Sequence, residues 1–218
     1  MVNKQQKQFV KFAEQQCSRS VETSRIDIVF KAFKRNYILV PLEAFGKDPY
    51  KTLISTILSA RTKDEITLEA SKRLFKMAAN FKKIDQLDEL EIRNLIYPVG
   101  FYKTKAKHLF KIARSHLAIV PNTREELMKL PGVGRKTANL VLNRAFGIPA
   151  IAVDTHVHRI CNILGWVKTK TPKETEIKLI KIIPKKYWSN LNRLFVSIGR
   201  QYTTNKKLIE FLRKEEIL

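Results

Sequence analysis

Apolar residues recur at helical spacing along almost the whole chain, with interruptions at proline, glycine and short polar caps. Alternation of apolar and polar residues, the pattern of a half-buried strand, is scarce, and its best candidate is the stretch from Tyr37 to Val40. The chain has only 7 glycines in 218 residues, which argues against a turn-rich β protein. The sequence therefore predicts an all-α fold of many short helices joined by short connections.

Three segments carry clear signals for the start of a helix. Asp48 offers an N-cap with Pro49 at the first helical position, and the segments 62–65 and 171–174 have the pattern of capping boxes. We expect the helix after Thr62 to run to about Met77, and the helix after Thr171 to stop before Pro184. Further helices are expected near residues 86–96, 102–118, 123–130, 135–146, 155–164 and 188–199, and a final amphipathic helix capped by Asn205.

Positive charge is concentrated in one part of the chain. The formal net charge is +22, from 42 Lys and Arg against 20 Asp and Glu. Between Ile92 and Lys173, fifteen Lys and Arg face only Glu125, Glu126 and Asp154, so more than half of the excess lies there. An ordinary solvated surface mixes both signs, so this stretch favours a polyanionic partner. Nucleic acid is favoured over a membrane because no strongly amphipathic helix with an exposed aromatic face flanks the basic stretch.

The chain lacks the segments that a membrane or secreted protein would show. No apolar run approaches the roughly 18 residues of a membrane-spanning helix, and the first residues, MVNKQQKQFV, are too polar for a signal peptide. We expect an intracellular protein without membrane contact, which in a prokaryote would be cytoplasmic and associated with the nucleoid.

Metal sites are not expected either. The only cysteines, Cys17 and Cys161, lie 144 positions apart, which excludes a disulfide framework, a zinc ribbon and a cysteine-ligated iron-sulfur cluster. His156 and His158 are two positions apart in a predicted helix and point about 200° apart, so one metal cannot easily take both.

Two of the seven glycines, Gly132 and Gly134, stand in one four-residue turn between predicted helices. Glycine lets the backbone approach another surface closely, and a helix that begins at 134–136 points free amides and its positive dipole end outward. These features suit a phosphate group, and such a contact fixes the register on a strand without reading bases. A tight turn between helices with no ligand is the alternative. The basic surroundings favour a DNA contact.

Lys136 and Asp154 suggest chemistry within this basic stretch. A lysine at a helix start does not stabilise the helix, because cations belong at the other end, so Lys136 is either a phosphate partner or an amine nucleophile. Asp154 is placed to cap the helix that begins at Thr155. It is also the only carboxylate between Glu126 and Glu174, and DNA phosphate would repel it unless it meets a developing positive charge. Together they could supply a nucleophile and an anionic partner for a sugar oxocarbenium ion.

At these residues the sequence resembles a known family. The run LPGVGRKTANLVLNRAFG followed by IAVDTHVHRICN is similar to the helix-hairpin-helix and Gly/Pro-Asp signature of the endonuclease III family of DNA glycosylases. The segments DPYKTLISTILSARTKDE and VGFYKTKAKHL resemble that family too, and the likeness spans roughly residues 42–200. It implies a two-lobed fold with the active-site cleft between the lobes. A six-helix central domain would span 42–148, and a second helical domain would combine 1–41 with 149–218.

The resemblance also assigns roles. It implies that Lys136 forms a Schiff base and that Asp154 is the catalytic aspartate. Arg61 stands where the family often has glutamine, and it would either fill the gap left by a flipped base or bind a phosphate. Gly132, Val133 and Gly134 would form the hairpin that grips a phosphate, and the further candidate DNA contacts are Arg135, Thr137, Lys103 and Lys105.

The activity implied is that of a bifunctional DNA glycosylase and AP lyase, a monomer that acts on double-stranded DNA with damaged bases or abasic sites. Oxidised pyrimidines are the expected substrates. Two alternatives stay open: another lesion preference, for oxidised purines or mismatches, and a non-catalytic helix-hairpin-helix DNA-binding protein. Most relatives carry four cysteines for a [4Fe-4S] cluster after a segment resembling Ser197 to Tyr202, whereas this chain has none there. We therefore expect no iron-sulfur cluster and no other cofactor.

Overall fold

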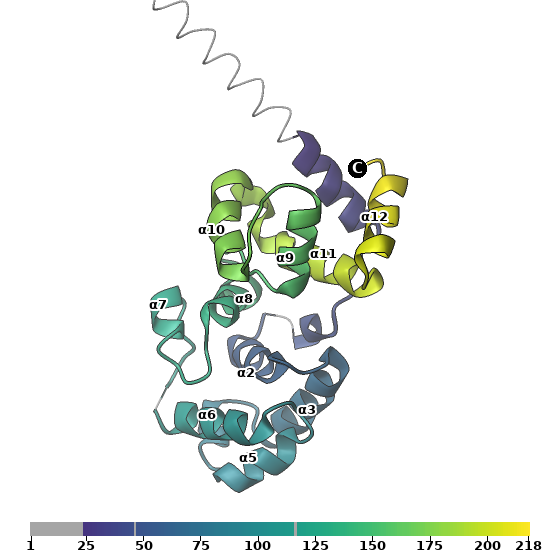
Figure 1. Cartoon of the computed structure of the whole chain (residues 1–218). Helices are drawn as coiled ribbons and strands as arrows, with labels where there is room; N and C mark the ends of the chain where they lie inside the picture. The colour runs from purple at the N-terminus through teal and green to yellow at the C-terminus, as the bar shows by residue number, and fades with distance from the viewer. Residues whose placement is uncertain (1–23, 46, 116) are drawn as a thin grey trace, which may run out of the picture.

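The computed structural model describes residues 24–45, 47–115 and 117–218, and all regular elements in these ranges are helices (Figure 1). The all-α prediction is confirmed. Residues 24–35 form a first helix. The later elements are η1 (Pro41–Phe45), α2 (Pro49–Ser59), α3 (Asp64–Met77), α4 (Phe81–Ile84), α5 (Glu89–Ile96), α6 (Tyr102–Arg114), α7 (Arg124–Leu127), α8 (Arg135–Phe146), α9 (Thr155–Ile163), α10 (Pro172–Ile182), η2 (Lys185–Tyr187), α11 (Trp188–Gln201) and α12 (Asn205–Lys214).

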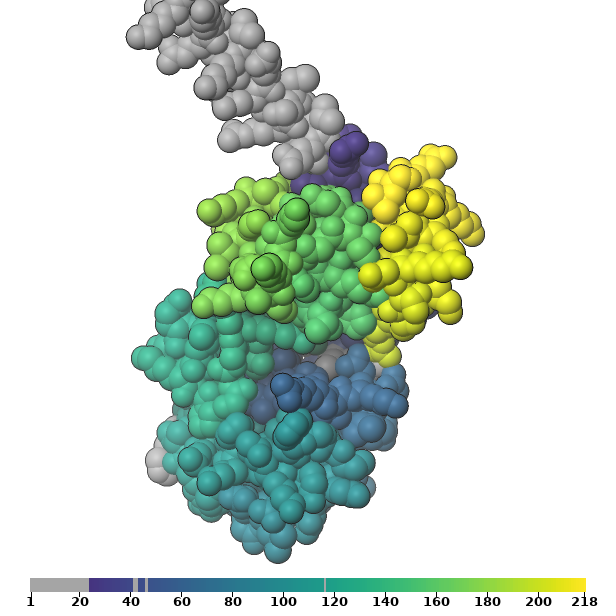
Figure 2. Space-filling view, in the orientation of Figure 1, coloured from purple at the N-terminus to yellow at the C-terminus, as the bar shows by residue number. Residues whose placement is uncertain are grey.

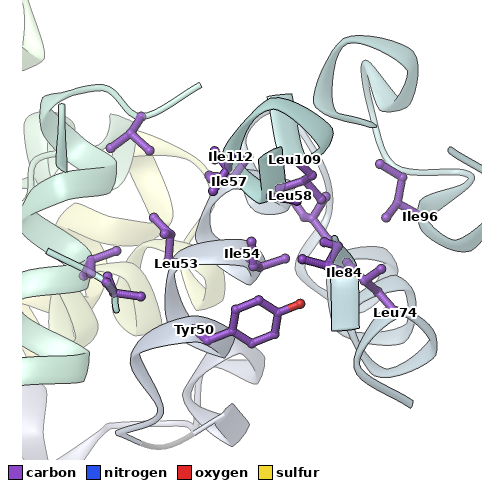
Figure 3. Packing of buried hydrophobic residues seen from close by; sticks show 14 of the residues in the cluster. Tyr50, Leu53, Ile54, Ile57, Leu58, Leu74, Ile84, Ile96, Leu109 and Ile112 are labelled. Carbon is purple, nitrogen blue, oxygen red and sulfur yellow. The ribbon is translucent and has the colours of Figure 1, made fainter. Parts of the chain in front are cut away.

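One hydrophobic cluster builds a central lobe from η1 and α2 to α8, with α2 at its centre (Figure 3). Asp48 caps α2 by accepting a hydrogen bond from the backbone N–H of Lys51 at 3.0 Å, and Pro49 takes the first helical position, as the sequence predicts. Leu53 and Leu58 are fully buried, and α2 packs against both α3 and α8. Burial of each such side chain stabilises the folded state by roughly 1.5–3 kcal/mol. The loop that follows α2 is therefore attached to a well-packed, buried helix.

A second hydrophobic cluster builds a terminal lobe from the helix 24–35, the segment 151–153 and α9 to α12. Figure 1 shows the first helix, in purple, beside the yellow α12, so both ends of the described chain lie in this lobe. Phe30 stacks on Tyr187 with ring centroids 4.1 Å apart, and Phe33 meets the edge of Phe195 at 4.9 Å. Residues 1–23 lie outside the described chain, and the domain boundaries 42–148 and 149–218 stay predictions.

Hydrogen bonds, ring stacking and hydrophobic burial stabilise the turn between α11 and α12. Arg159 of α9 donates hydrogen bonds to the backbone carbonyls of Gly199 and Tyr202, at 3.2 and 2.6 Å, and to that of Thr203. Tyr202 stacks on Phe211 of α12 with ring centroids 4.3 Å apart. Leu208, Phe211 and Leu212 of α12 are buried in the terminal cluster. The last helix is thus held in the terminal lobe by hydrophobic packing and by the hydrogen bonds of Arg159 at its joint with α11.

Three local predictions are wrong. Residues 37–40 do not form a strand; instead the backbone N–H and C=O of Ile38 both bond the side-chain hydroxyl of Ser197. The cap of α12 is Thr204, which leaves Asn205 as the first helical residue. Thr62 does not cap α3, which begins at Asp64 without a side-chain cap, because the Thr62 hydroxyl accepts from Gly100 and Lys105 instead.

Candidate active site

The predicted hairpin is formed by α7, a turn and α8. The N–H of Val133 bonds the carbonyl of Leu130 at 3.1 Å and closes the turn. Gly132 has φ of +78°, and a Cβ on it would lie 2.5 Å from Nδ1 of His108. Both the left-handed backbone and the close contact therefore require glycine at this position. Gly134 is the N-cap of α8, and it has no neighbour within 4 Å of the place where a Cβ would stand. The first backbone N–H groups of a helix have no acceptor within the helix, so those at the start of α8 can donate hydrogen bonds to an anion.

Lys136 and Asp154 lie together at the N-termini of α8 and α9. The Lys136 Nζ is 4.0 Å from the Asp154 Oδ2, and the lysine side chain is 49% exposed while the aspartate is 13% exposed. Asp154 caps α9, because its Oδ1 accepts a hydrogen bond from the backbone N–H of Val157 at 2.9 Å. One carboxylate oxygen is thus used for folding, and the other faces the amine.

A cavity of about 520 Å³ contains both side chains and is lined by both lobes. Figure 2 shows the surface hollowed where the blue segments of the central lobe meet the green segments of the terminal lobe. Arg61 and Thr62 come from the loop after α2, and Arg200 comes from α11. A cavity of about 960 Å³ elsewhere in the central lobe is larger, but it contains neither Lys136 nor Asp154. The smaller cavity is therefore the candidate site, on chemical grounds.

The remaining lining of the site cavity includes a histidine and an arginine that spans the lobes. Burial lowers the pKa of His156, although the carboxylate of Asp154 opposes this shift. Arg200 pairs with Asp64 and, at 2.6 Å, with Glu65 at the start of α3. These ion pairs join α11 of the terminal lobe to the central lobe beside the cleft.

The predicted DNA contact Arg135 holds the hairpin in place. Its Nε donates to the Glu176 carboxylate of α10 at 2.8 Å, and Glu176 is 4% exposed. Asn139 of α8 donates to the same carboxylate at 3.1 Å and to the carbonyl of Ile151 at 2.7 Å. Arg124 of α7 donates to the Asn139 side chain at 2.8 Å. This network fixes both hairpin helices against α10, so Arg135 has a structural role that the sequence did not indicate.

The structure corrects the expectation that Lys105 lies at the DNA surface. Lys105 is 6% exposed, and its Nζ donates to the carbonyls of Leu58 and Ala60, at 2.7 and 2.5 Å, and to the Thr62 hydroxyl at 3.1 Å. Burial lowers the pKa of this lysine to about 8. Its donors are occupied inside the protein, and it holds the loop that carries Arg61.

The other predicted residues lie as follows. Gly132, Gly134 and Lys103 are exposed, Thr137 is half-buried in the first turn of α8, and the Val133 side chain is packed in the central cluster. Val133 can therefore offer only its backbone to a ligand.

The structure adds Phe101, which sequence reasoning missed. Phe101 is 60% exposed at the N-cap of α6 and has φ of +58°. Arg61, itself at φ of +52°, lies with its Cζ 5.6 Å from the centroid of the Phe101 ring. The guanidinium of Arg61 thus lies over an exposed aromatic ring in a cation–π arrangement. The signal of Phe101 in the sequence was only its position in VGFYKTKAKHL, because a lone aromatic carries no periodic pattern.

Comparisons with known proteins agree with one another. Residues 54–185 match the family model described as the HhH-GPD superfamily of base excision DNA repair proteins. Over 177 residues the chain is 48% identical to endonuclease III of Thermotoga maritima, covering 79% of this chain and 80% of that one. It is 40% identical over 184 residues to endonuclease III of Buchnera aphidicola, covering 83% and 88%.

Solved structures give the same result. The fold is similar to a trapped endonuclease III–DNA covalent intermediate, an estranged-adenine complex, with a TM-score of 0.73 and 33% identity over 85% of this chain and 89% of that one. A thermostable thymine-DNA glycosylase shares the fold at a TM-score of 0.74 and 22% identity, over 87% and 91% of the two chains. No helix in the described ranges is long and apolar enough to cross a membrane.

Proposed function

Because the chain belongs to the endonuclease III family, within the HhH-GPD superfamily of base excision repair DNA glycosylases, we propose that it excises oxidised pyrimidines from duplex DNA through Lys136 and cleaves the strand at the resulting abasic site. One observation carries the proposal. The Lys136 amine lies 4.0 Å from the Asp154 carboxylate in a cavity large enough for an extrahelical base.

The hairpin positions the DNA strand. A phosphate next to the lesion binds the free amides at the start of α8, where the helix dipole favours negative charge. The open space at Gly134 lets the backbone of the strand approach closely. The damaged nucleotide then rotates out of the duplex into the cleft, and the Arg61–Phe101 pair fills the space that it leaves by stacking against the neighbouring bases.

Base removal follows from the placement of the amine and the carboxylate. The neutral amine of Lys136 attacks C1′ of the damaged nucleotide, so that the Nζ–C1′ bond forms while the bond from C1′ to the base breaks. The base leaves with the electron pair of that bond and takes up a proton. Asp154 stabilises the positive charge that develops on the sugar, and its Oδ2 faces the amine that must give up protons as the imine forms.

Strand cleavage uses the same covalent adduct. The nitrogen lone pair then forms the imine as the C1′–O4′ bond breaks, and O4′ takes up a proton. Lys136 is now joined to C1′ as a protonated imine, which makes the C2′ hydrogen acidic. Loss of that proton expels the 3′ phosphate by β-elimination, and water then hydrolyses the imine and restores the free lysine.

The donor set of this chain does not fit the iron-sulfur cluster of its relatives. Only two cysteines are present, and Cys161 is fully buried within the terminal cluster, far in sequence from the joint after α11. That joint carries Tyr202 stacked on Phe211 and the three hydrogen bonds of Arg159. We propose that packing of α12 takes the structural place of the cluster, and no step of the reaction is routed through a cofactor.

A lesion panel tests the proposal. The protein is incubated with duplexes that contain a single thymine glycol, 8-oxoguanine, mismatched thymine or abasic site, and base release and strand cleavage are measured separately. We expect release of thymine glycol with cleavage 3′ to the site, and a loss of at least about 100-fold in both steps for Lys136→Ala. Lys206→Gln on α12 is the control, since it removes an exposed lysine from the terminal lobe.

The outcomes separate the alternatives. Preferred release of 8-oxoguanine or mismatched thymine would keep the reaction and overturn the lesion preference. Binding to all four duplexes without base release or strand cleavage would identify a non-catalytic DNA-binding protein. In that case Lys136→Ala would only reduce the salt dependence of binding by about one unit of slope.

A further inference from the structure

Arg144 lies in the same cleft as Lys136 but has no role in the reaction described so far. It belongs to α8 and follows Lys136 by eight residues, a little over two helical turns, or about 12 Å along the axis. Lys136, Leu140 and Arg144 all line the 520 Å³ cavity. Asp154 lines the same cavity, so Arg144 shares the cleft with both members of the candidate catalytic pair.

The guanidinium of Arg144 has no partner among the residues that the structure describes. The neighbouring arginines differ: Arg135 is paired with Glu176, Arg193 with Glu43, and Arg200 with Asp64 and Glu65. Burial lowers the pKa of Arg144, while the carboxylates of Glu43, Asp64 and Asp154 oppose that shift from a distance. With no hydrogen-bonded partner in the described chain, the guanidinium donors of Arg144 can bind the acceptors of a ligand in the cleft.

The cavity position indicates what that ligand is. In the proposed complex a phosphate of the strand binds at the exposed start of α8, whereas Arg144 lines the cleft further along this helix. Arg144 also lines a cavity of about 230 Å³, whose lining includes neither Lys136 nor Asp154. The part of the substrate that enters the cleft past the sugar is the extrahelical base. Its edge carries carbonyl oxygens, which are good acceptors for a guanidinium.

We propose that Arg144 is a base-binding residue that donates hydrogen bonds to the carbonyl oxygen beside the glycosidic nitrogen, O2 of an oxidised pyrimidine. This inference rests on the proposed function. As the bond from C1′ to the base breaks, its electron pair moves onto the base and is shared between N1 and O2. A positively charged donor at O2 stabilises that charge until the base takes up a proton from solvent.

Base release and strand cleavage should therefore differ in how strongly they depend on Arg144. At an abasic site there is no base and no leaving group of this kind, so Arg144 has nothing to bind. Substitution should therefore slow release of the base and spare strand cleavage at an abasic site made beforehand. A role in folding or in phosphate binding would affect both steps alike.

The test measures single-turnover rates on a thymine glycol duplex and on a matched abasic duplex. For Arg144→Gln we expect release of thymine glycol to fall about 10- to 100-fold, with cleavage of the abasic duplex within about two-fold of wild type. Retained cleavage also shows that the variant is folded. Arg144→Lys should recover part of the loss, since it keeps the charge but not the planar fork.

The control is Arg193→Gln, which removes an arginine that lines the 230 Å³ cavity but not the cleft, and which should leave both rates within about two-fold. If Arg144→Gln lowered the single-turnover rates equally on both duplexes, or lowered neither rate, the proposal would be overturned. Inactivity of the wild-type protein on both duplexes would instead overturn the proposed function.

Discussion

Asp154 uses its two carboxylate oxygens for different purposes. Oδ1 caps α9 through the N–H of Val157, and Oδ2 faces the Lys136 amine. Because the cap also fixes the side chain, the folding role and the proposed catalytic role depend on one rotamer. A substitution that keeps the cap but removes the charge separates them.

For Asp154→Asn we expect little change in the free energy of unfolding, within about 0.5 kcal/mol, because asparagine caps helices as well as aspartate does. Base release should fall by about 100-fold or more, because the negative charge opposite the developing cation is lost. Urea unfolding and single-turnover kinetics on a thymine glycol duplex measure the two effects. Unchanged base release would show that Asp154 is only a helix cap.

Lys105 allows a prediction about pH. Its pKa is lowered by burial to about 8 from an ordinary 10.5, so between these values the unfolded chain binds the proton that the folded protein has lost. The contribution of Lys105 to stability must then rise with pH from about 8 to about 10.5, by up to roughly 3 kcal/mol. The free energy of unfolding of the wild type, minus that of Lys105→Met, is measured across this range. A difference that stays flat or falls would contradict the assignment.

At the scale of elements, the hairpin has two glycines with different tasks. Gly132 is required by its left-handed backbone and by the contact with His108, whereas Gly134 has an ordinary φ of −94° and open space beside it. Within the described chain nothing requires a residue as small as glycine at the Gly134 N-cap, so its small size would matter for the approach of a bound strand.

Alanine at each glycine tests this division. Gly134→Ala should lower the free energy of unfolding by no more than about 1 kcal/mol, the cost of a poorer N-cap, and weaken DNA binding about ten-fold, because the added methyl group occupies the approach of the phosphate backbone. Gly132→Ala should destabilise the fold by more than about 1 kcal/mol. Fluorescence anisotropy with an abasic duplex and urea unfolding measure both variants. Full DNA affinity of Gly134→Ala would argue against the hairpin as the phosphate grip.

Prediction from sequence succeeds where the determinant is local. The caps of α2 and α10 at Asp48 and Thr171, and the bounds of α8, follow from residues within one turn of each other. It fails where a distant partner competes. The Thr62 hydroxyl bonds Lys105, 43 residues away, and Ile38 bonds Ser197, 159 residues away.

The same limit applies to the candidate site. Local features single out Lys136 and Asp154, the resemblance to the family implies their roles, and the structure brings the two side chains together. The burial of Lys105 and the placement of Arg144 in the cleft depend on how several elements pack. No pattern of neighbouring residues encodes them.

At the scale of the whole molecule, the cleft exists because two separate cores meet along it. α8 belongs to the central lobe and carries Lys136, while Asp154 caps α9 of the terminal lobe. Arg200 with Asp64 and Glu65, and Glu176 with Arg135, hold the lobes on either side. The spacing of amine and carboxylate is therefore a property of the lobe arrangement, and it depends on the stability of the terminal lobe.

The role of α12 in that stability can be measured. Leu212 is fully buried in the terminal cluster, so Leu212→Ala should lower the free energy of unfolding by about 2–5 kcal/mol. Leu218→Ala, at a leucine that is 53% exposed, should change it by less than about 0.5 kcal/mol. Urea unfolding is followed by circular dichroism. Equal, small effects of the two variants would mean that α12 does not support the lobe.

The central claim, that Lys136 forms the covalent bond to DNA, has a direct measurement. The protein is mixed with an abasic duplex, the imine is reduced with borohydride, and the trapped complex is digested and mapped by mass spectrometry. We expect the deoxyribose remnant on the peptide that contains Lys136, and no trapped complex with Lys136→Ala. A remnant on another lysine or on the N-terminal amine of the wild-type protein would contradict the claim.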